Sequence, residues 1–382
     1  MNNIFYVKDY ITSGKTDSQI IDDCLLDADK CSVKTIVFDT KDWLIDRAIL
    51  IPSNTTVIVD GVKIKQRDYT FDNIFRPSNI TINESDPYGF PLSVSKAVNI
   101  KIMGKNGAIL EGPNVHKTMY HSEFKEEQEM IGDFWGWRGF QIYMPYTEHY
   151  EISGFKFLKQ RSWAISMDRS KHGYLHDMEF ISTVKNGDGI NVRAGCSNIT
   201  IENIKGETTD DLIAVNSGTN VKATYPMGRY IFPLVATNYD KQNENIEERY
   251  VYNIIIKNIY TKGVSGVALL SRHGNKIFNV NISHVYDLHT STFVHTLYKN
   301  ENLKLVSSYK GYWQEYFTKG DYYNINIDNV HSKFFKHTVD LGDEFLNVKI
   351  SNVTQGYSKG ELLTFVDTQD MSEIKIENCK MV

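Results

Sequence analysis

The stretch from Asn186 to Gly218, NGDGINVRAGCSNITIENIKGETTDDLIAVNSG, decides the fold. It contains three short runs, GINVR, NITIENI and LIAVN, in which aliphatic and polar residues alternate. Such alternation is typical of half-buried β-strands. Asp188 precedes the first run, and the pair Asp210 and Asp211 precedes the last run, 22 and 23 positions further on. A chain that repeats strands at such a period stacks its coils into a solenoid.

The same motif recurs along most of the chain. An Asn or an equivalent residue opens an alternating run at Asn79, Asn99, Tyr150, Tyr174, Asn198, Asn253, Asn279, Asn324, Asn347 and Glu373. Most steps between these positions span 20 to 26 residues, and we interpret the longer steps of 45, 51 and 55 residues as two coils each. Matching Asn residues suit stacked turns, because Asn tolerates left-handed backbone. The sequence therefore predicts an all-β fold, a right-handed parallel β-helix forming a single domain over 1–382. An antiparallel sandwich is the alternative, and it does not explain the common register.

One amphipathic helix is expected near the N-terminus, over residues 17–30. Thr16 or Asp17 can cap its first turn. Its apolar stripe consists of Ile20, Ile21, Cys24, Leu25 and Leu26. Such a helix would cover the open first coil of a solenoid, whose backbone and apolar side chains are otherwise exposed. An ordinary surface helix is the alternative.

Composition excludes some functions and leaves others open. The formal net charge of −5 gives no basic footprint for nucleic acid. No apolar run is long enough for a membrane span, and the N-terminus lacks the pattern of a signal peptide. We therefore expect a cytoplasmic protein or a trimmed secreted one, with no nucleic-acid or membrane partner.

The four cysteines, Cys24, Cys31, Cys196 and Cys379, lack metal-site spacing, so free thiols are expected, with a Cys24–Cys31 bridge as the alternative.

The spacing of the three aspartates indicates chemistry. If each opens a strand on a neighbouring coil, Asp188, Asp210 and Asp211 lie about 4.8 Å apart in the stacking direction. Like charges at that separation resist simultaneous ionisation, so the pKa of at least one group should rise. A protonated acid beside an ionised base is what hydrolysis of a glycosidic bond requires. The alternative is that the aspartates cap turns or bind a cation such as calcium, as a lyase would need.

The stretch from Tyr150 to Gly218 resembles the central part of the polygalacturonases of glycoside hydrolase family 28. Those enzymes place Asn-Thr-Asp before one strand and Asp-Asp before the strand of the next coil. Here Asn186, Gly187 and Asp188 match the first motif with Gly for Thr, and Asp210 and Asp211 match the second. The N-terminal segment also resembles the opening of pectin-active β-helix proteins and phage tailspikes. The resemblance implies an inverting hydrolase of pectic or other uronate-containing glycans, without cofactor or metal. It implies that Asp210 is the general acid and that Asp188 and Asp211 activate water.

Downstream the chain departs from the family pattern. Members of the family carry Gly-His-Gly after the aspartate pair and Arg-Ile-Lys one coil later. The Arg-Ile-Lys motif binds the galacturonate carboxylate. Ser265 stands where the histidine is expected, and we interpret TFVHTLYK, residues 292–299, as the later strand. Other cations could form a positive subsite, because Arg pairs with carboxylate oxygens and Lys offers a point charge. The candidates are Arg193, Arg272, His273, His295 and Lys299.

Aromatic residues suggest a sugar-binding wall. The run DFWGWRGFQIYMPYTEHY, residues 133–150, includes Trp137 and Arg138, and Trp163 lies on the coil before Asp188. Sugar rings stack on such side chains through their apolar faces. We expect loop insertions near the cleft at 113–140 and 219–250. The alternative for the aromatic run is a hydrophobic plug against the solenoid.

Two other functions remain open at this point. A polysaccharide lyase or epimerase on the same fold would need a cation or a basic residue to acidify the proton beside a uronate carboxylate. A non-catalytic carbohydrate-binding module or tailspike-like β-helix would cleave no bond. The inverting hydrolase explains all three aspartates and is the leading hypothesis. The sequence does not decide the oligomeric state.

Overall fold

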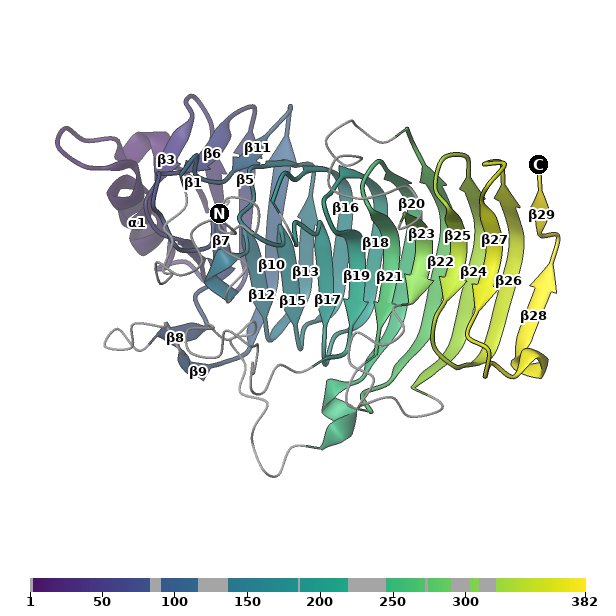
Figure 1. Cartoon of the computed structure of the whole chain (residues 1–382). Helices are drawn as coiled ribbons and strands as arrows, with labels where there is room; N and C mark the ends of the chain where they lie inside the picture. The colour runs from purple at the N-terminus through teal and green to yellow at the C-terminus, as the bar shows by residue number, and fades with distance from the viewer. Residues whose placement is uncertain are drawn as a thin grey trace, which may run out of the picture. The chain divides into compact units, whose positions relative to one another are not determined.

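The computed structural model describes residues 3–82, 91–115, 137–184, 186–218, 245–271, 274–289, 303–308 and 321–382. The chain divides into two compact units. Unit 1 consists of Met1–Gly187 and Asn220–Asp240, and unit 2 consists of Asp188–Thr219 and Lys241–Val382. Parallel strands stacked into sheets build both units, and the fold is the predicted right-handed parallel β-helix (Figure 1). That the whole chain is a single domain stays a prediction.

Three ladders of parallel strands form unit 1. The first consists of β1 (Ile4–Tyr6), β2 (Lys34–Phe38), β5 (Thr55–Asp60), β10 (Ala97–Lys105), β13 (Thr147–Ser153) and β16 (Lys171–Ile181). The second consists of β3 (Trp43–Ile45), β6 (Lys63–Gln66), β11 (Ile109–Glu111) and β14 (Lys156–Leu158), and β14 also pairs with the end of β16. The third consists of β4 (Ile49–Ile51), β7 (Phe75–Pro77), β12 (Ile142–Pro145) and β15 (Ile165–Asp168).

Two ladders form unit 2. One consists of β17 (Ile190–Arg193), β19 (Asp211–Asn216), β21 (Ser265–Leu270), β23 (Lys304–Ser308), β25 (His337–Leu341) and β27 (Glu361–Phe365). The other consists of β18 (Ser197–Glu207), β20 (Val251–Thr261), β22 (Ile277–Asp287), β24 (Tyr322–Ser332) and β26 (Phe345–Gln355), followed by β28 (Ile374–Glu377) and β29 (Lys380–Met381). Short 3₁₀ turns are η1 (Val7–Tyr10), η3 (Trp137–Gly139), η4 (Ile246–Arg249) and η7 (Met371–Glu373).

The predicted asparagine ladder is present in unit 2. Asn198, Asn253, Asn279, Asn324 and Asn347 all have positive φ, between 51° and 57°. From Asn253 onward, each side-chain amide donates to the amide oxygen of the preceding Asn, at 2.5 to 3.1 Å. The left-handed backbone explains why Asn occupies these positions.

The structure corrects the interpretation of the long steps. Ile254 of β20 lies opposite Ile199 of β18, and Ile325 of β24 lies opposite Val280 of β22, so these strands are direct neighbours. The steps of 55 and 45 residues are therefore single coils with long connections, rather than two coils each. β10 and β13 are likewise adjacent. The run after Asn79 is no coil strand either, because β8 (Ile80–Ile82) pairs antiparallel with β9 (Pro91–Val94).

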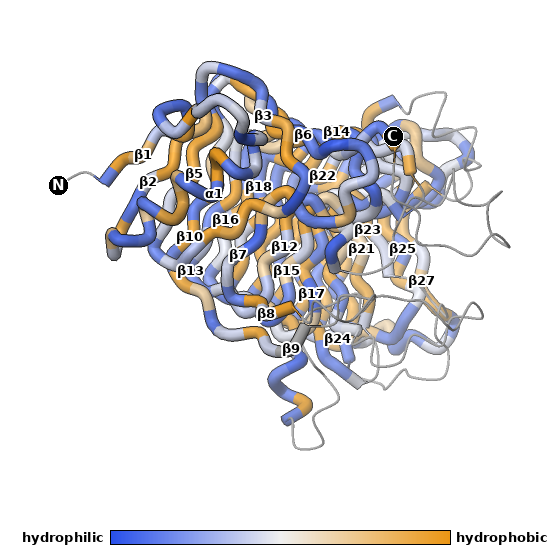
Figure 2. Tube along the Cα trace, turned by 90° about the vertical axis from the view of Figure 1, so that its left-hand side faces the viewer, coloured by the Kyte–Doolittle hydropathy of each residue, from blue (hydrophilic) through white to orange (hydrophobic). Residues whose placement is uncertain are grey.

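Aliphatic side chains fill the interior of unit 2 in register. Ile199, Ile254, Val280, Ile325 and Val348 occupy one column and are at most 1% exposed. Burying each side chain of this size contributes about 1.5–3 kcal/mol to folding. Hydrophobic and hydrophilic residues alternate along the strands in Figure 2, as the period of two predicts.

The predicted N-terminal helix is α1 (Asp17–Ala28). Thr16 accepts from the Gln19 backbone N–H, and the Gln19 side chain accepts from the Thr16 backbone, which forms a capping box. The helix ends two residues earlier than predicted. It packs against β2, β3 and β4 of the first coil. Ala28 completes its buried face, whereas Leu26 is 73% exposed and does not belong to it.

The predictions about the cysteines, a membrane span and the loop insertions can be compared with the described residues. All four cysteines are free thiols, as expected. Among the described residues, no helix has the length and apolar character needed to cross a membrane. Most of the predicted insertions at 113–140 and 219–250 lie outside the described residues, which omit 116–136 and 219–244.

Candidate active site

The strand register of unit 2 brings the predicted aspartates together. β17 and β19 are adjacent and parallel, with Ile190 opposite Ile213. Continued two residues back, this register sets Asp188 opposite Asp211. The Gly189 backbone N–H donates to the Asp211 carbonyl at 3.0 Å, which supports that alignment. Their backbones are therefore about one strand spacing apart, some 4.8 Å.

The three carboxyl groups differ in exposure. Asp188 and Asp211 are each 4% exposed, whereas Asp210 is half-buried. The Thr208 hydroxyl donates to the Asp210 carbonyl at 2.9 Å and holds the turn that presents the pair. Of the three, Asp210 is thus the side chain with the most access to a ligand.

Asp188 occupies an unfavourable electrostatic position. Its Oδ2 accepts from Asn191 Nδ2 at 3.0 Å, and its buried Oδ1 has no hydrogen-bond partner in the structure described. Burial, followed by the charges of Asp210 and Asp211, raises the pKa of Asp188 well above its usual range. Ionisation of Asp188 is therefore disfavoured beside the other two carboxyl groups, in the direction that the spacing predicts.

The column that begins with Asp211 continues with polar residues on every later coil. Ser265 lies opposite Asp211, Lys304 opposite Ser265, His337 opposite Lys304, and Glu361 opposite His337. Ser265 thus occupies the position predicted for it on the coil after the aspartate pair.

Lys304 is a residue that the sequence interpretation missed. The strand paired with β21 is β23, which begins at Lys304, so the assignment of that strand to residues 292–299 is wrong. The Lys304 ammonium pairs with Asp340 Oδ2 at 2.5 Å. The available signal was the alternating run KLVSS, but the step of 39 residues from Ser265 to Lys304 (304 − 265) exceeds the usual period and hid it.

Arg193 lies in unit 2 but is only 2% exposed. Its Nη2 donates to the Gly218 carbonyl at 3.0 Å, and the Asn216 side chain accepts from the Gly218 N–H at 2.8 Å. These contacts fix the backbone after β19. The other predicted cations, Arg272, His273, His295 and Lys299, lie outside the described residues.

The predicted aromatic wall belongs to unit 1. Trp137 is fully buried in a cluster with Phe140 and Tyr143. This burial agrees with the alternative prediction, in which the aromatic run is a hydrophobic plug. Trp163 is partly exposed and stacks on Phe140, with ring centroids 5.0 Å apart. Arg138 pairs with a buried carboxylate of the same unit. Sugar stacking on Trp163 stays a prediction.

Residues 48–227 match the family described as glycosyl hydrolases family 28. The matched segment contains all three aspartates, so the predicted resemblance is confirmed. The protein is a glycoside hydrolase. No curated protein sequence matches the chain.

Several solved structures share the fold. The hyperthermoactive exopolygalacturonase of Thermotoga maritima is 12% identical with a TM-score of 0.53, over 97% of this chain and 93% of that chain. A galactohydrolase acting on 1,3-α-1,4-β-D-galactose-4-sulfate-3,6-anhydro-D-galactose-2-sulfate is 13% identical with a TM-score of 0.59, over 100% and 88%. The endo-xylogalacturonan hydrolase of Aspergillus tubingensis is 10% identical with a TM-score of 0.54, over 99% and 92%. At these identities the likeness supports the fold alone.

Proposed function

We propose that the protein hydrolyses a uronate-containing, pectic glycan with inversion at the anomeric carbon. Asp210 acts as the general acid, and Asp188 and Asp211 activate the attacking water. The observation that carries the proposal is the raised pKa of Asp188, caused by burial and by the charges of Asp210 and Asp211. A shared proton in such a cluster supplies an acid and a base at the same pH.

Exposure favours this division of roles. The general acid must reach the leaving-group oxygen, and Asp210 is the least buried of the three. Because Asp188 titrates together with its neighbours, a proton of the cluster can reside on Asp210 in the reacting complex. Asp188 and Asp211 are then ionised and orient a water. An inverting enzyme separates acid and base by about 6.5–9.5 Å to admit that water.

Lys304 supports an acidic substrate. It lies two coils from Asp211 in the same column, a distance of about 10 Å along the stack at the usual strand spacing. An ammonium at that place can attract the carboxylate of a neighbouring sugar unit. The exopolygalacturonase and the xylogalacturonan hydrolase that share the fold act on galacturonan-type polymers by their descriptions, which agrees with this choice.

The test compares the wild type with Asp210→Asn on a panel of pectic oligosaccharides, with reducing-sugar release as the measurement. We expect the substitution to lower the rate by about 10²–10⁴-fold, the usual contribution of a general acid. Asp367→Asn, an exposed carboxylate of the same unit, serves as the control and should keep full activity. Full activity of Asp210→Asn, at an unchanged melting temperature, would refute the assignment.

A further inference from the structure

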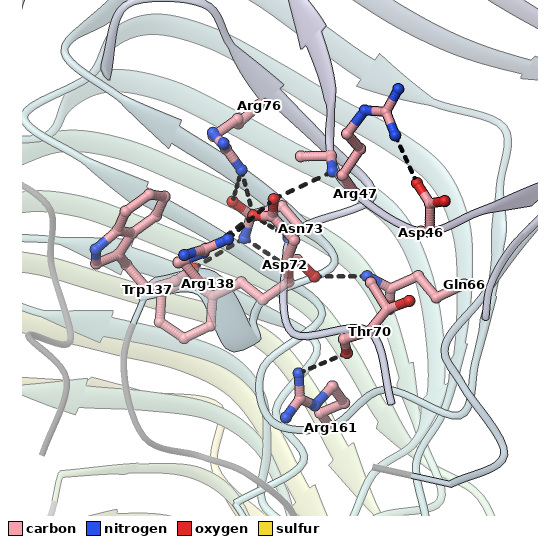
Figure 3. A network of polar contacts seen from close by, with 12 residues as sticks. Asp46, Arg47, Gln66, Thr70, Asp72, Asn73, Arg76, Trp137, Arg138 and Arg161 are labelled. Atoms are coloured by element: carbon pink, nitrogen blue, oxygen red, sulfur yellow. Dashed lines mark hydrogen bonds and ion pairs between the residues drawn. The ribbon is translucent and has the colours of Figure 1, made fainter. Parts of the chain in front are cut away.

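A buried ionic network lies in unit 1 immediately before and on β7 (Figure 3). Asp72 accepts from the backbone N–H groups of Asn73 and Ala48 at 3.0 and 3.2 Å. The same carboxylate pairs with the guanidinium groups of Arg76 and Arg138. The site described above, in unit 2, uses none of these residues.

Counted over the described residues, the network carries more positive than negative charge. Burial alone would raise the pKa of Asp72, but the charges of Arg76 and then Arg138 outweigh it, so its pKa lies below the usual range. Asp72 is therefore ionised, and it is the single acidic partner of both arginines among the described residues. Arg76 is only 5% exposed. A buried guanidinium without full compensation is unfavourable unless an anion joins it.

Arg76 is held in a fixed orientation. Its Nη1 donates to Asp72 and to the Asn73 side-chain oxygen. Its guanidinium carbon lies 5.3 Å from the centre of the Trp137 ring. Asn73 in turn donates to the backbone carbonyls of Trp137 and Phe140, both at 2.8 Å. These contacts use one end of the guanidinium, and its other edge makes no hydrogen bond to the described residues.

This unpaired edge has the geometry of an oxyanion receptor. Nε and Nη2 of a guanidinium point along one edge and bind two oxygens of a carboxylate or sulfate side by side. In Arg76, Nε is buried and has no hydrogen-bond partner among the described residues. Nη2 makes no hydrogen bond within the part of the chain that the structure describes. The network reaches the surface through Arg138, whose side chain is 26% exposed.

We propose that the Nε–Nη2 edge of Arg76, assisted by the charge of Arg138, binds an oxyanion of an acidic saccharide, either a uronate carboxylate or a sulfate ester. The choice of a saccharide rests on the proposed function. The receptor itself rests on the buried donor edge and the excess charge. It forms an anion subsite in unit 1, separate from the catalytic carboxylates.

The direct test observes the Arg Nε–H resonances by NMR of protein labelled at arginine. Galacturonate, galactose 6-sulfate and neutral galactose are titrated in separate experiments. We expect the Arg76 resonance to shift saturably with one or both acidic sugars and not with galactose. A shift with galacturonate alone assigns the carboxylate, and a shift with galactose 6-sulfate alone assigns the sulfate ester. No shift with either acidic sugar, or an equal shift with galactose, would overturn the inference.

A variant gives a second, independent test. Arg76→Lys keeps the charge but removes the paired donors, and it should weaken binding of the acidic sugar by tenfold or more. Arg47→Lys is the matched control, because Arg47 lies in the same unit and pairs with Asp22 and Asp46 at the surface. Equal affinity of Arg76→Lys and the wild type would contradict the proposal. If that variant does not fold, the titration of the wild type still decides.

The two proposals can fail separately. Hydrolysis that depends on Asp210, without any response of Arg76 to acidic sugars, would refute the proposed subsite and support the proposed hydrolase activity. A response of Arg76 without hydrolysis of any acidic glycan would refute the proposed hydrolysis of acidic glycans and support the proposed subsite.

Discussion

At the scale of single residues, Asp188 has the least favourable electrostatic environment of the proposed catalytic groups. Its carboxyl group is buried beside two other carboxyl groups, and one of its oxygens has no hydrogen-bond donor among the described residues. A site built for stability alone would not hold such a group, because burying an unsatisfied charge is costly. Strain of this kind is typical of functional sites.

This environment predicts an unusual stability effect. Because the folded state raises the pKa of Asp188, the folded protein binds more protons than the unfolded chain above the ordinary aspartate range. The free energy of unfolding therefore decreases as pH rises from that range to the folded pKa. Asp188→Asn should remove the penalty and raise the free energy of unfolding at pH 7 by about 1 kcal/mol. The gain should vanish as pH falls below the ordinary aspartate range.

Urea unfolding at several pH values measures the effect. The asparagine can still accept from Asn191 through its amide oxygen, so the substitution is conservative in shape. A variant that is less stable than the wild type at pH 7, or that has the same pH dependence, would contradict the electrostatic description of Asp188.

Lys304 gives a prediction about specificity. Lys304→Gln should raise KM for oligogalacturonides by about tenfold with little change in kcat, because a contact made equally in the ground and transition states affects binding alone. Lys333→Gln, at an exposed position in the same unit, is the control. Steady-state kinetics on acidic and neutral oligosaccharides measure the effect. An equal loss on both kinds of substrate would show that Lys304 does not recognise the carboxylate.

At the scale of elements, the asparagine ladder sets the register of the coils. Asn279 donates to Asn253 and accepts from Asn324, with a φ of 54°. The sequence predicted this ladder because left-handed turns favour Asn wherever they recur. The distances in sequence between successive Asn positions were harder to interpret, because a long connection between adjacent coils adds residues without adding a strand. This is also why Lys304 was missed while Asp210 was found, since only a short connection separates Asp210 from Asp188.

Substitution of Asn279 separates the two contributions of the ladder. Asn279→Gly keeps the left-handed backbone and loses the hydrogen bonds, whereas Asn279→Ala loses both. We expect the alanine variant to be less stable than the glycine variant by about 1 kcal/mol, which is the cost of a left-handed residue with a Cβ atom. Thermal unfolding of the pair measures the difference. Equal stability of the two variants would show that the backbone conformation at this position does not limit stability.

At the scale of the whole molecule, the sequence predicted the class of fold and the alignment of Asp188 with Asp211 on adjacent strands, and it predicted the surroundings of these residues less well. The period and the aspartate pair are local signals, so they could be read directly. Burial is not local: Trp137 was a candidate for sugar stacking, yet it is fully buried. The network around Asp72 and Arg76 was not predicted either, because no spacing in the sequence indicates that two arginines share one carboxylate.

The most direct test of the central claim is the anomeric configuration of the first product, followed by proton NMR during the first minutes of hydrolysis. The proposed arrangement of Asp188, Asp210 and Asp211 predicts that the product appears first with the configuration opposite to that of the cleaved bond. Initial release of the same configuration would contradict inversion. An unsaturated product that absorbs in the ultraviolet would instead show elimination rather than hydrolysis.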